Sequence, residues 1–182
     1  MTCIVGIVNK KEKRVVMGAD SAGVGGYEIT IRKDPKIFKV GDFVIGCTSS
    51  FRMIQLLRFS LKLPKVEKEI YEYMCTDFID AVRKCLKEGG FMEKERDAEV
   101  IGTFLVAYKD RLFKIESDLQ VGESVDGIMA CGCGENYALG VLKYNQLLAG
   151  IELDTERIIT NSLIIAEKLS AGVAKPFKIL ST

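Results

Sequence analysis

Residues 2–20 read Thr2-Cys-Ile-Val-Gly-Ile-Val-Asn-Lys-Lys-Glu-Lys-Arg-Val-Val-Met-Gly-Ala-Asp20, and this stretch largely decides the fold. Two runs rich in β-branched and other apolar residues, 2–9 and 14–20, lie on either side of a charged segment at 10–13. Two apolar runs joined by a short polar turn are typical of a β-hairpin. The chain is therefore expected to begin with two antiparallel strands.

The rest of the chain is organised as groups of strands and pairs of helices. Further strands are predicted at 27–31, 36–40, 43–48, 100–108, 111–116, 127–131 and 177–181. Helices are predicted from apolar residues at helical spacing, at 51–61, 70–88, 135–148 and 154–169, with Asp154 as an N-cap. A Gly-rich loop is expected at 21–26 and a charged connection at 93–99.

This order predicts an α+β fold, because strands that come in hairpins form antiparallel sheets and not a doubly wound parallel sheet. So many apolar strands are best buried if two sheets pack against each other between two layers of helices. We therefore expect a four-layer αββα sandwich. The length of 182 residues predicts a single domain, residues 1–182.

Composition limits the possible partners and location. The chain has 26 Lys+Arg against 25 Asp+Glu, and this balance gives no reason to expect a nucleic acid partner. No apolar run reaches the roughly 18 residues that span a bilayer, and no secretory leader is recognisable. We expect a cytoplasmic protein with no membrane partner, in which six reduced cysteines act as small buried hydrophobes: Cys3, Cys47, Cys75, Cys85, Cys131 and Cys133.

The chain contains no histidine, and this absence restricts the chemistry further. Ser-His-Asp and Cys-His catalysis are excluded, as are metal sites that need imidazole. Gly132 and Gly134 do not complete a dinucleotide fingerprint, because position 137 is tyrosine. We therefore expect no cofactor and no metal, and a hydrolase built from this chain needs a carboxylate, a lysine or an α-amine as its base.

Thr2 is the first candidate for catalysis. An N-terminal Met is normally removed when the second residue is small, and Thr2 would then carry both a hydroxyl and a free α-amine. The ordinary pKa of that amine is about 7.7–8.0, so it can act as a base near neutral pH. A threonine activated by its own amine requires no histidine. A plainer interpretation is that Thr2 only begins a strand.

Asp20 and Lys36 strengthen the first interpretation. Asp20 ends the second strand, and Lys36 stands sixteen positions later (36 − 20) at the start of another. With Thr2, these residues resemble the β-type proteasome subunits and the bacterial peptidase HslV, which have an N-terminal threonine, an acid and a lysine that leads a strand. The resemblance implies that Lys36 lowers the pKa of the Thr2 amine and that Asp20 holds Lys36. Lys33 and Lys39 are the alternatives to Lys36.

The resemblance extends to the segment Val44-Ile-Gly-Cys-Thr-Ser-Ser50. It implies that the backbone N–H of Ser50, where the family has glycine, forms the oxyanion hole at the start of a helix. It also implies that Val24 and Thr48 line the substrate pocket. Ser49 or Ser50 is at the same time a candidate N-cap for the helix that follows.

Two later segments complete the resemblance, which covers residues 2–181. Cys133, in Ala130-Cys-Gly-Cys-Gly134, stands where the family has a serine close to the amine. Cys131 and Cys133 could instead form half of a metal site. The family's Asp-x-x-Ser-Gly-Gly is matched by Glu167-Lys-Leu-Ser-Ala-Gly172, which implies that Glu167 and Ser170 lie near the amine. An outward-facing position on an amphipathic helix is the commoner explanation for Glu167.

The resemblance implies a threonine-type endopeptidase with Thr2 as its nucleophile, which cleaves unfolded polypeptides inside a homo-oligomeric ring. The chain has no Gly-x4-Gly-Lys-Ser/Thr loop, so a separate ATPase would have to unfold the substrate. Two alternatives remain at this point. One is an N-terminal-nucleophile amidase that acts on a small amide, and the other is a catalytically inactive ring subunit.

Overall fold

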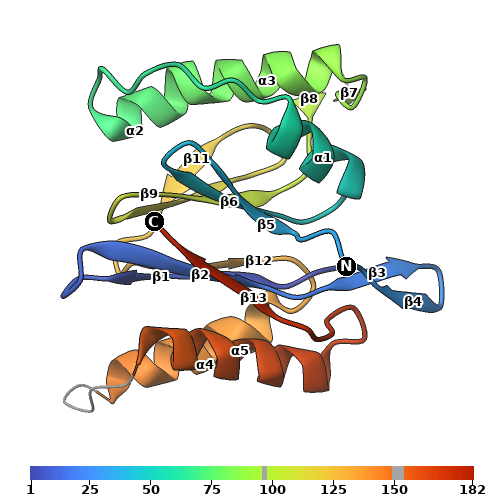
Figure 1. The fold of residues 1–182 in the computed structure, drawn as a ribbon, viewed down its shortest axis with the longest axis vertical. Coiled ribbons are helices and arrows are strands. Elements are labelled where there is room, and N and C mark those ends of the chain that lie inside the picture. Colours follow the sequence, from blue (N-terminus) through green and yellow to red (C-terminus); the bar gives the residue numbers. More distant parts are fainter. Residues whose placement is uncertain (96–97, 149–153) are drawn as a thin grey trace.

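The computed structural model describes residues 1–95, 98–148 and 154–182. Figure 1 shows two sheets packed face to face, with one layer of helices above them and another below. The predicted α+β fold, a four-layer αββα sandwich of two antiparallel sheets, is confirmed.

The first sheet contains the hairpin expected at the start of the chain. Its four strands lie in the order β12 (Ile128–Cys131), β1 (Ile4–Asn9), β2 (Arg14–Ala19) and β13 (Lys178–Ser181). All neighbouring strands are antiparallel. Asn9 pairs with Arg14 across the charged turn, in agreement with the strands predicted on either side of residues 10–13.

The second sheet has five strands, and two tight turns connect most of it. The strands lie in the order β11 (Val121–Glu123), β10 (Arg111–Ile115), β9 (Phe104–Tyr108), β6 (Phe43–Cys47) and β5 (Ile37–Val40). Gly41, with φ 56°, and Lys109, with φ 51°, adopt the left-handed conformation that two-residue hairpin turns require.

The two sheets face each other across an apolar layer. Ile4 from β1, Val44 from β6 and Leu105 from β9 are among its fully buried members. A Cβ on Gly46 would lie 2.6 Å from Cγ2 of Ile4, so glycine allows the sheets to approach closely there. This packing fixes the position of the N-terminal strand against the strand that leads into the first helix.

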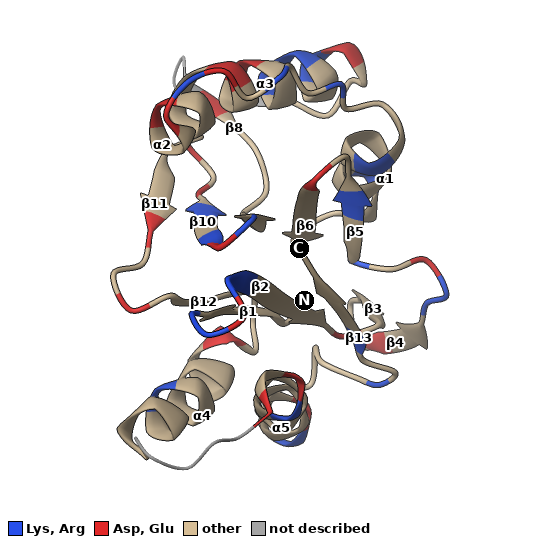
Figure 2. Cartoon of the chain, turned by 60° about the vertical axis from the view of Figure 1, so that its left-hand side comes forward, with Lys and Arg blue, Asp and Glu red and all other residues tan. Residues whose placement is uncertain are grey.

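The two helix layers cover the outer faces of the sheets. Above the five-stranded sheet lie α1 (Phe51–Phe59), α2 (Ile70–Tyr73), the π-helical turn η1 (Met74–Phe78) and α3 (Ile79–Glu88). Their buried residues and those of the sheet beneath them form one hydrophobic core. Below the four-stranded sheet lie α4 (Glu135–Leu147) and α5 (Thr155–Leu169). Figure 2 shows charged residues on these helices and on the turns, and also on strands such as β5 and β10.

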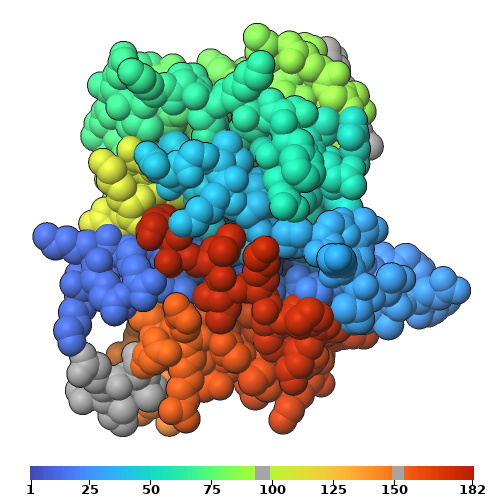
Figure 3. Space-filling view, in the orientation of Figure 1, coloured from blue at the N-terminus to red at the C-terminus, as the bar shows by residue number. Residues whose placement is uncertain are grey.

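Some sequence predictions were wrong in detail. Part of the predicted Gly-rich loop forms β3 (Ala22–Gly25), which pairs with β4 (Glu28–Ile31). Glycine disfavours strands, but pairing with β4 outweighs that preference. This hairpin projects from the body of the molecule at the right of Figure 3. The short strand β11 was not predicted, because three residues are too few for a clear alternation.

The segment between α3 and β9 also differs from expectation. The predicted charged connection at 93–99 contains β7 (Glu93–Glu95) and the start of β8 (Ala98–Val100), which pair with each other, while residues 96–97 lie outside the described residues. The strand predicted at 100–108 begins only at Phe104. Within the described residues, no helix is both long enough and apolar enough to cross a membrane.

Candidate active site

Thr2 lies at the entrance of β1 and is fixed there by the loop that follows β12. It is buried, and its carbonyl accepts a hydrogen bond from the Gly134 amide at 3.2 Å. Gly132 passes so close that an added Cβ would lie 2.3 Å from this carbonyl oxygen, and its φ of 99° belongs to the left-handed region. A glycine is therefore required beside Thr2.

Asp20 follows β2 directly, and three backbone amides hold its carboxylate. Cys3 donates to Oδ1 at 2.9 Å, while Ala22 and Ala174 donate to Oδ2 at 2.8 and 3.3 Å. These donors come from the N-terminal strand, from the start of β3 and from the loop after α5. Asp20 therefore joins three separate segments beside Thr2 and keeps a fixed orientation.

Lys36 precedes β5 and completes the cluster. Its ammonium lies 2.9 and 3.0 Å from the two carboxylate oxygens of Asp20 and 3.4 Å from the Met1 carbonyl. Burial lowers the pKa of Lys36 below its ordinary value of 10.5, although the Asp20 carboxylate opposes this effect. The alternatives Lys33 and Lys39 are exposed, so the structure brings Lys36 and neither of them to Thr2.

The Thr2 nitrogen lies beside a thiol. Met1 is present, so this nitrogen is an amide here and stands in for the α-amine that removal of Met1 would create. It donates to Sγ of Cys133 at 3.2 Å, and the Ser170 hydroxyl donates to the same sulfur at 3.3 Å. The Thr2 hydroxyl contacts the Met1 carbonyl. Cys133 therefore contacts the amine position directly, and Ser170 is connected to it through the Cys133 sulfur.

Glu167 makes different contacts. Its carboxylate accepts a hydrogen bond from the Lys175 amide at 2.9 Å and forms an ion pair with the Lys175 ammonium at 3.2 Å. These contacts fasten the loop after α5, which supplies the Ala174 amide to Asp20. The described contacts of Glu167 therefore connect it with this loop and not with Thr2.

Ser50 serves as the N-cap of α1, because its hydroxyl accepts a hydrogen bond from the Arg52 amide at 3.1 Å. Its own N–H, the predicted oxyanion donor, bonds to the Thr48 carbonyl at 2.8 Å. Ser49 lies between them with φ 66°, a left-handed conformation that is strained for a residue other than glycine. Ser50 and Thr2 line the same pocket, but in this structure the Ser50 N–H is occupied by the Thr48 carbonyl.

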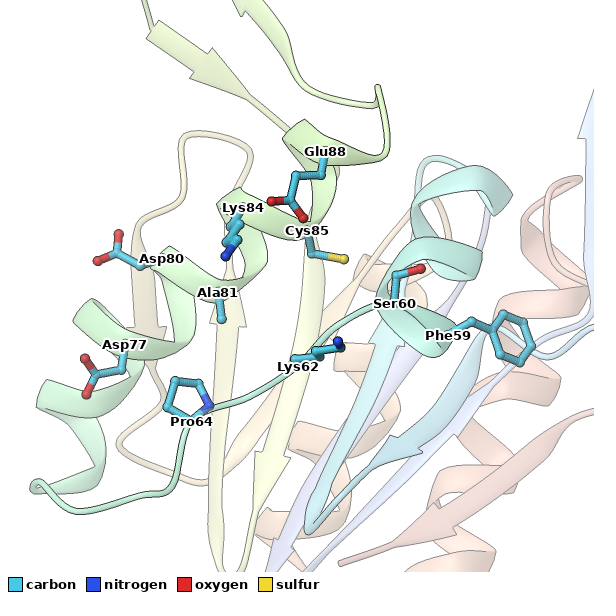
Figure 4. Close-up of a pocket in the computed structure, with 10 residues that line it drawn as sticks. All are labelled: Phe59, Ser60, Lys62, Pro64, Asp77, Asp80, Ala81, Lys84, Cys85 and Glu88. Atoms are coloured by element: carbon cyan, nitrogen blue, oxygen red, sulfur yellow. The ribbon is translucent and has the colours of Figure 1, made fainter.

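A small pocket of about 50 Å³ opens beside Thr2, and the two predicted substrate-binding residues, Val24 and Thr48, line it. Phe51 and Ile54, two of the apolar residues whose spacing predicts the helix at 51–61, line it as well, although neither is a predicted site residue. Their positions directly after Ser50 and one helical turn later are the signal that could have identified them. A larger hollow of about 740 Å³, shown in Figure 4, lies against α3 and contains none of the predicted site residues.

The cysteines also require correction. Cys75 and Cys133 are exposed, so only Cys3, Cys47, Cys85 and Cys131 are the buried hydrophobes that were expected. Cys131 packs in the apolar layer between the sheets, whereas Cys133 contacts Thr2. The two thiols therefore do not share one site. No group of three or more potential ligands for a metal ion occurs among the described residues.

The fold and the buried cluster define a class of proteins. Over its full length the chain has the fold of the HslV-like N-terminal-nucleophile hydrolases, which confirms the resemblance at the level of fold. BPH from Thiobacillus denitrificans, in complex with epoxomicin, has a TM-score of 0.81 and 20% identity over 100% of this chain and 98% of that one. HslV from Trypanosoma brucei has a TM-score of 0.68 and 19% sequence identity, over 99% of this chain and 98% of that one.

Anbu, an ancestral β-subunit from Yersinia bercovieri, has a TM-score of 0.66 and 14% identity, over 100% of this chain and 81% of that one. No protein-family model and no curated protein sequence matches the chain. At these identities the comparisons establish the fold, and the activity has to be argued from the residues of this chain.

Proposed function

We propose that this protein is a threonine-type endopeptidase whose nucleophile is the Thr2 hydroxyl after removal of Met1. The observation that carries the proposal is the buried Lys36–Asp20 pair beside Thr2, with nitrogen–oxygen distances of 2.9 and 3.0 Å. A buried ion pair contributes little net stability compared with apolar packing of the same volume. A functional reason for keeping it is therefore attractive, and a cation beside an N-terminal amine provides one.

Apart from water and the substrate, the proposed reaction needs no group from outside the chain. The Thr2 amine takes the proton of its own hydroxyl through a water molecule, and the oxygen attacks the carbonyl carbon of the substrate. The positive charge of Lys36 favours the neutral, basic form of the amine. The amine then gives its proton to the leaving amine of the substrate, and water hydrolyses the ester that remains on Thr2.

The oxyanion of the intermediate requires donors close to Thr2. Ser50 supplies a backbone N–H at the start of α1, once the turn at Ser49 has turned this group away from the Thr48 carbonyl. Formation of the tetrahedral intermediate would offer the N–H a charged acceptor in place of a neutral one. Because charge-assisted hydrogen bonds are roughly twice as strong as neutral ones, this exchange is favourable.

We also propose that copies of this chain assemble into a ring that admits unfolded polypeptide delivered by a separate ATPase, in the cytoplasm. The projecting hairpin β3–β4 supports the assembly part, because Tyr27, Ile29 and Ile31 are large apolar residues exposed at its surface. An isolated two-stranded hairpin is only marginally stable in water. Contact with a second copy would cover these side chains and stabilise the hairpin that carries Val24.

The decisive experiment combines intact mass with covalent labelling. The protein is purified from cells, weighed, and incubated with epoxomicin, the compound bound by the BPH structure. We expect loss of Met1 and one adduct on the peptide that begins with Thr2. Thr2→Ala should remove both the adduct and the cleavage of unfolded casein, whereas Thr76→Ala, which changes an exposed threonine on the outer helix layer, should change neither. Cleavage that persists in Thr2→Ala contradicts the proposal.

A catalytically inactive ring subunit is the second candidate. The hydrogen bond that occupies the Ser50 N–H favours it, because an oxyanion hole without a free donor loses about 10²–10³-fold in rate. A protein that keeps Met1, takes no adduct and still forms a ring would support this candidate over the first.

A further inference from the structure

We propose that the pocket beside Thr2 restricts cleavage to bonds that follow a small, uncharged residue such as alanine, serine or glycine. This inference rests on the proposed function, since it concerns the residue whose carbonyl Thr2 attacks, called P1 below. It assigns specificity to Phe51 as a wall of the pocket, and to Arg32 as the residue that holds Phe51 in place.

The size of the pocket is the first argument. With Met1 present the pocket measures about 50 Å³, and Met1 is itself one of the residues that line it. An apolar cavity of about 150 Å³ accepts benzene, so the pocket in this form has no room for an aromatic ring or a branched side chain. The Met1 side chain lies beside Gly172, because a Cβ added to Gly172 would be 2.3 Å from the Cβ of Met1. Removal of Met1 therefore opens the pocket on that side, and the walls made by α1 and β3 still limit it.

The chemistry of the lining is the second argument. Thr48 donates its hydroxyl to the Thr103 carbonyl at 2.8 Å, and its methyl group lies 3.3 Å from the Cβ position of Gly132, beside Thr2. Ile54 and Val24 add further apolar surface. Among the described residues, Lys36 is the only charged one in the lining, and Asp20 already neutralises it. A charged P1 side chain would lose its hydration here without gaining a partner.

The rigidity of the wall is the third argument. The guanidinium of Arg32 lies 3.8 Å from the centre of the Phe51 ring, a cation–π contact. Asp34 accepts two hydrogen bonds from the same guanidinium, at 2.9 and 2.7 Å. This pair of parallel hydrogen bonds holds the guanidinium plane over the ring. Hydrogen bonding to Arg32 also lowers the pKa of Asp34 below its ordinary value. Phe51 is thus fixed from outside and cannot easily swing away to admit a larger side chain.

The test uses two peptides that differ only at P1, one with alanine and one with leucine. We expect kcat/KM for the alanine peptide to exceed that for the leucine peptide by at least about 10-fold, since misfit by a few methylenes discriminates by about 10–200-fold. Phe51→Ala should lower this ratio at least about 10-fold, mainly because the leucine peptide is cleaved faster. Equal or better cleavage of the leucine peptide by the unaltered protein overturns the inference.

The chain supplies a matched control on the same helix. Phe59 ends α1, is 74% exposed, and also carries an arginine over its ring, with Arg58 at 4.8 Å. Figure 4 shows its ring pointing away from the other labelled residues. Phe59→Ala should leave the ratio of the two peptides unchanged. The inference fails if Phe59→Ala and Phe51→Ala change the ratio equally.

The variant Arg32→Lys tests separately whether Arg32 holds Phe51 in place. It also avoids the loss of side-chain volume that could unfold the Phe51→Ala variant. Lysine keeps the charge but has no planar group to stack on the ring and no fork for Asp34. We expect a partial fall of the ratio, with kcat for the alanine peptide nearly unchanged. If Arg32→Lys slows both peptides equally and keeps the ratio, Arg32 has only a structural role and this part of the inference is wrong.

The variant Thr2→Ala separates the failure of the specificity from the failure of the proposed function. Peptide cleavage that Thr2→Ala abolishes, together with a preference for leucine, leaves the peptidase intact and overturns the small-residue specificity alone. Absence of cleavage of both peptides by the unaltered protein overturns the peptidase, and the specificity falls with it.

Discussion

Two ion-pair clusters of this protein each combine a cation with carboxylate groups, but in opposite surroundings. Lys36 and Asp20 lie inside, with side chains that are 1% and 0% exposed. Arg111 lies at the surface between Glu123 and Glu69, and its side chain is 34% exposed. Backbone N–H groups donate to the carboxylate of the inner pair, whereas the side chains of the outer cluster are partly open to solvent.

The difference shows which interactions stabilise this fold and which serve its site. Removal of two charges from water costs several kcal/mol per ion, and only good geometry with additional hydrogen bonds recovers that cost. Exposed pairs cost little and contribute little. The inner pair should therefore respond strongly to the loss of one partner, and the outer cluster only weakly.

The largest effect is expected from Lys36→Met, which leaves the Asp20 carboxylate buried without its cation. We expect a loss of about 3–5 kcal/mol in the free energy of unfolding, together with loss of peptide cleavage, because nothing then favours the neutral Thr2 amine. Chemical denaturation and a peptide assay measure the two quantities.

The double variant Lys36→Met with Asp20→Asn separates stability from activity. It removes both charges and keeps roughly the same volume, so it should recover part of the lost stability and none of the activity. Recovery of activity would show that the charge of Lys36 is not needed, and retention of full stability by Lys36→Met alone would contradict the contrast between the two clusters.

The resemblance to the β-type proteasome subunits and HslV pointed to the inner pair, because the strand pattern alone left Lys33 and Lys39 as alternatives to Lys36. In the structure Asp20 directly follows β2 and Lys36 directly precedes β5. The four layers were predicted from the residues themselves, from strands that come in pairs.

Features that depend on a single backbone angle or on a loop could not be predicted. The bond from the Ser50 N–H to the Thr48 carbonyl depends on the φ of Ser49, for which a serine in the sequence gives no signal. Glu167 meets Lys175 because the loop after α5 folds back, and helical periodicity does not describe that loop. Pairing of β3 with β4 is likewise a tertiary preference that outweighs the glycine content.

An intermediate effect is expected from pH, again through Lys36. Burial lowers the pKa of Lys36 in the folded protein below its ordinary value of 10.5. At pH values between that lowered pKa and 10.5, the unfolded chain therefore binds more protons at Lys36 than the folded protein does. The contribution of Lys36 to stability therefore rises with pH in this window. Cleavage should instead fall there, because the ammonium that assists Thr2 is lost.

The measurement is kcat/KM as a function of pH, with unfolding free energies of the unaltered protein and Lys36→Met in parallel. We expect a bell-shaped profile, with an acid limb from the Thr2 amine and an alkaline limb below pH 10.5. The difference in stability between the two proteins isolates Lys36 from other groups that titrate at alkaline pH. If kcat/KM begins to fall only above pH 10.5, a group other than Lys36 is responsible for the alkaline limb.

The smallest effect is expected from Arg111→Ala, in the outer cluster. Arg111 bonds to Glu123 and Glu69 at the surface of the five-stranded sheet, where water replaces lost partners readily. We expect the Tm to fall by at most about 4 °C, and by less at 1 M salt, because exposed pairs are weak and screened. Peptide cleavage should not change. Arg111→Lys is the matched control, since lysine keeps the charge but cannot make the two parallel hydrogen bonds of a guanidinium to one carboxylate. If Arg111→Ala lowers the Tm as much as Lys36→Met does, burial is not what distinguishes the two clusters, and the argument that the inner pair is kept for function loses its basis.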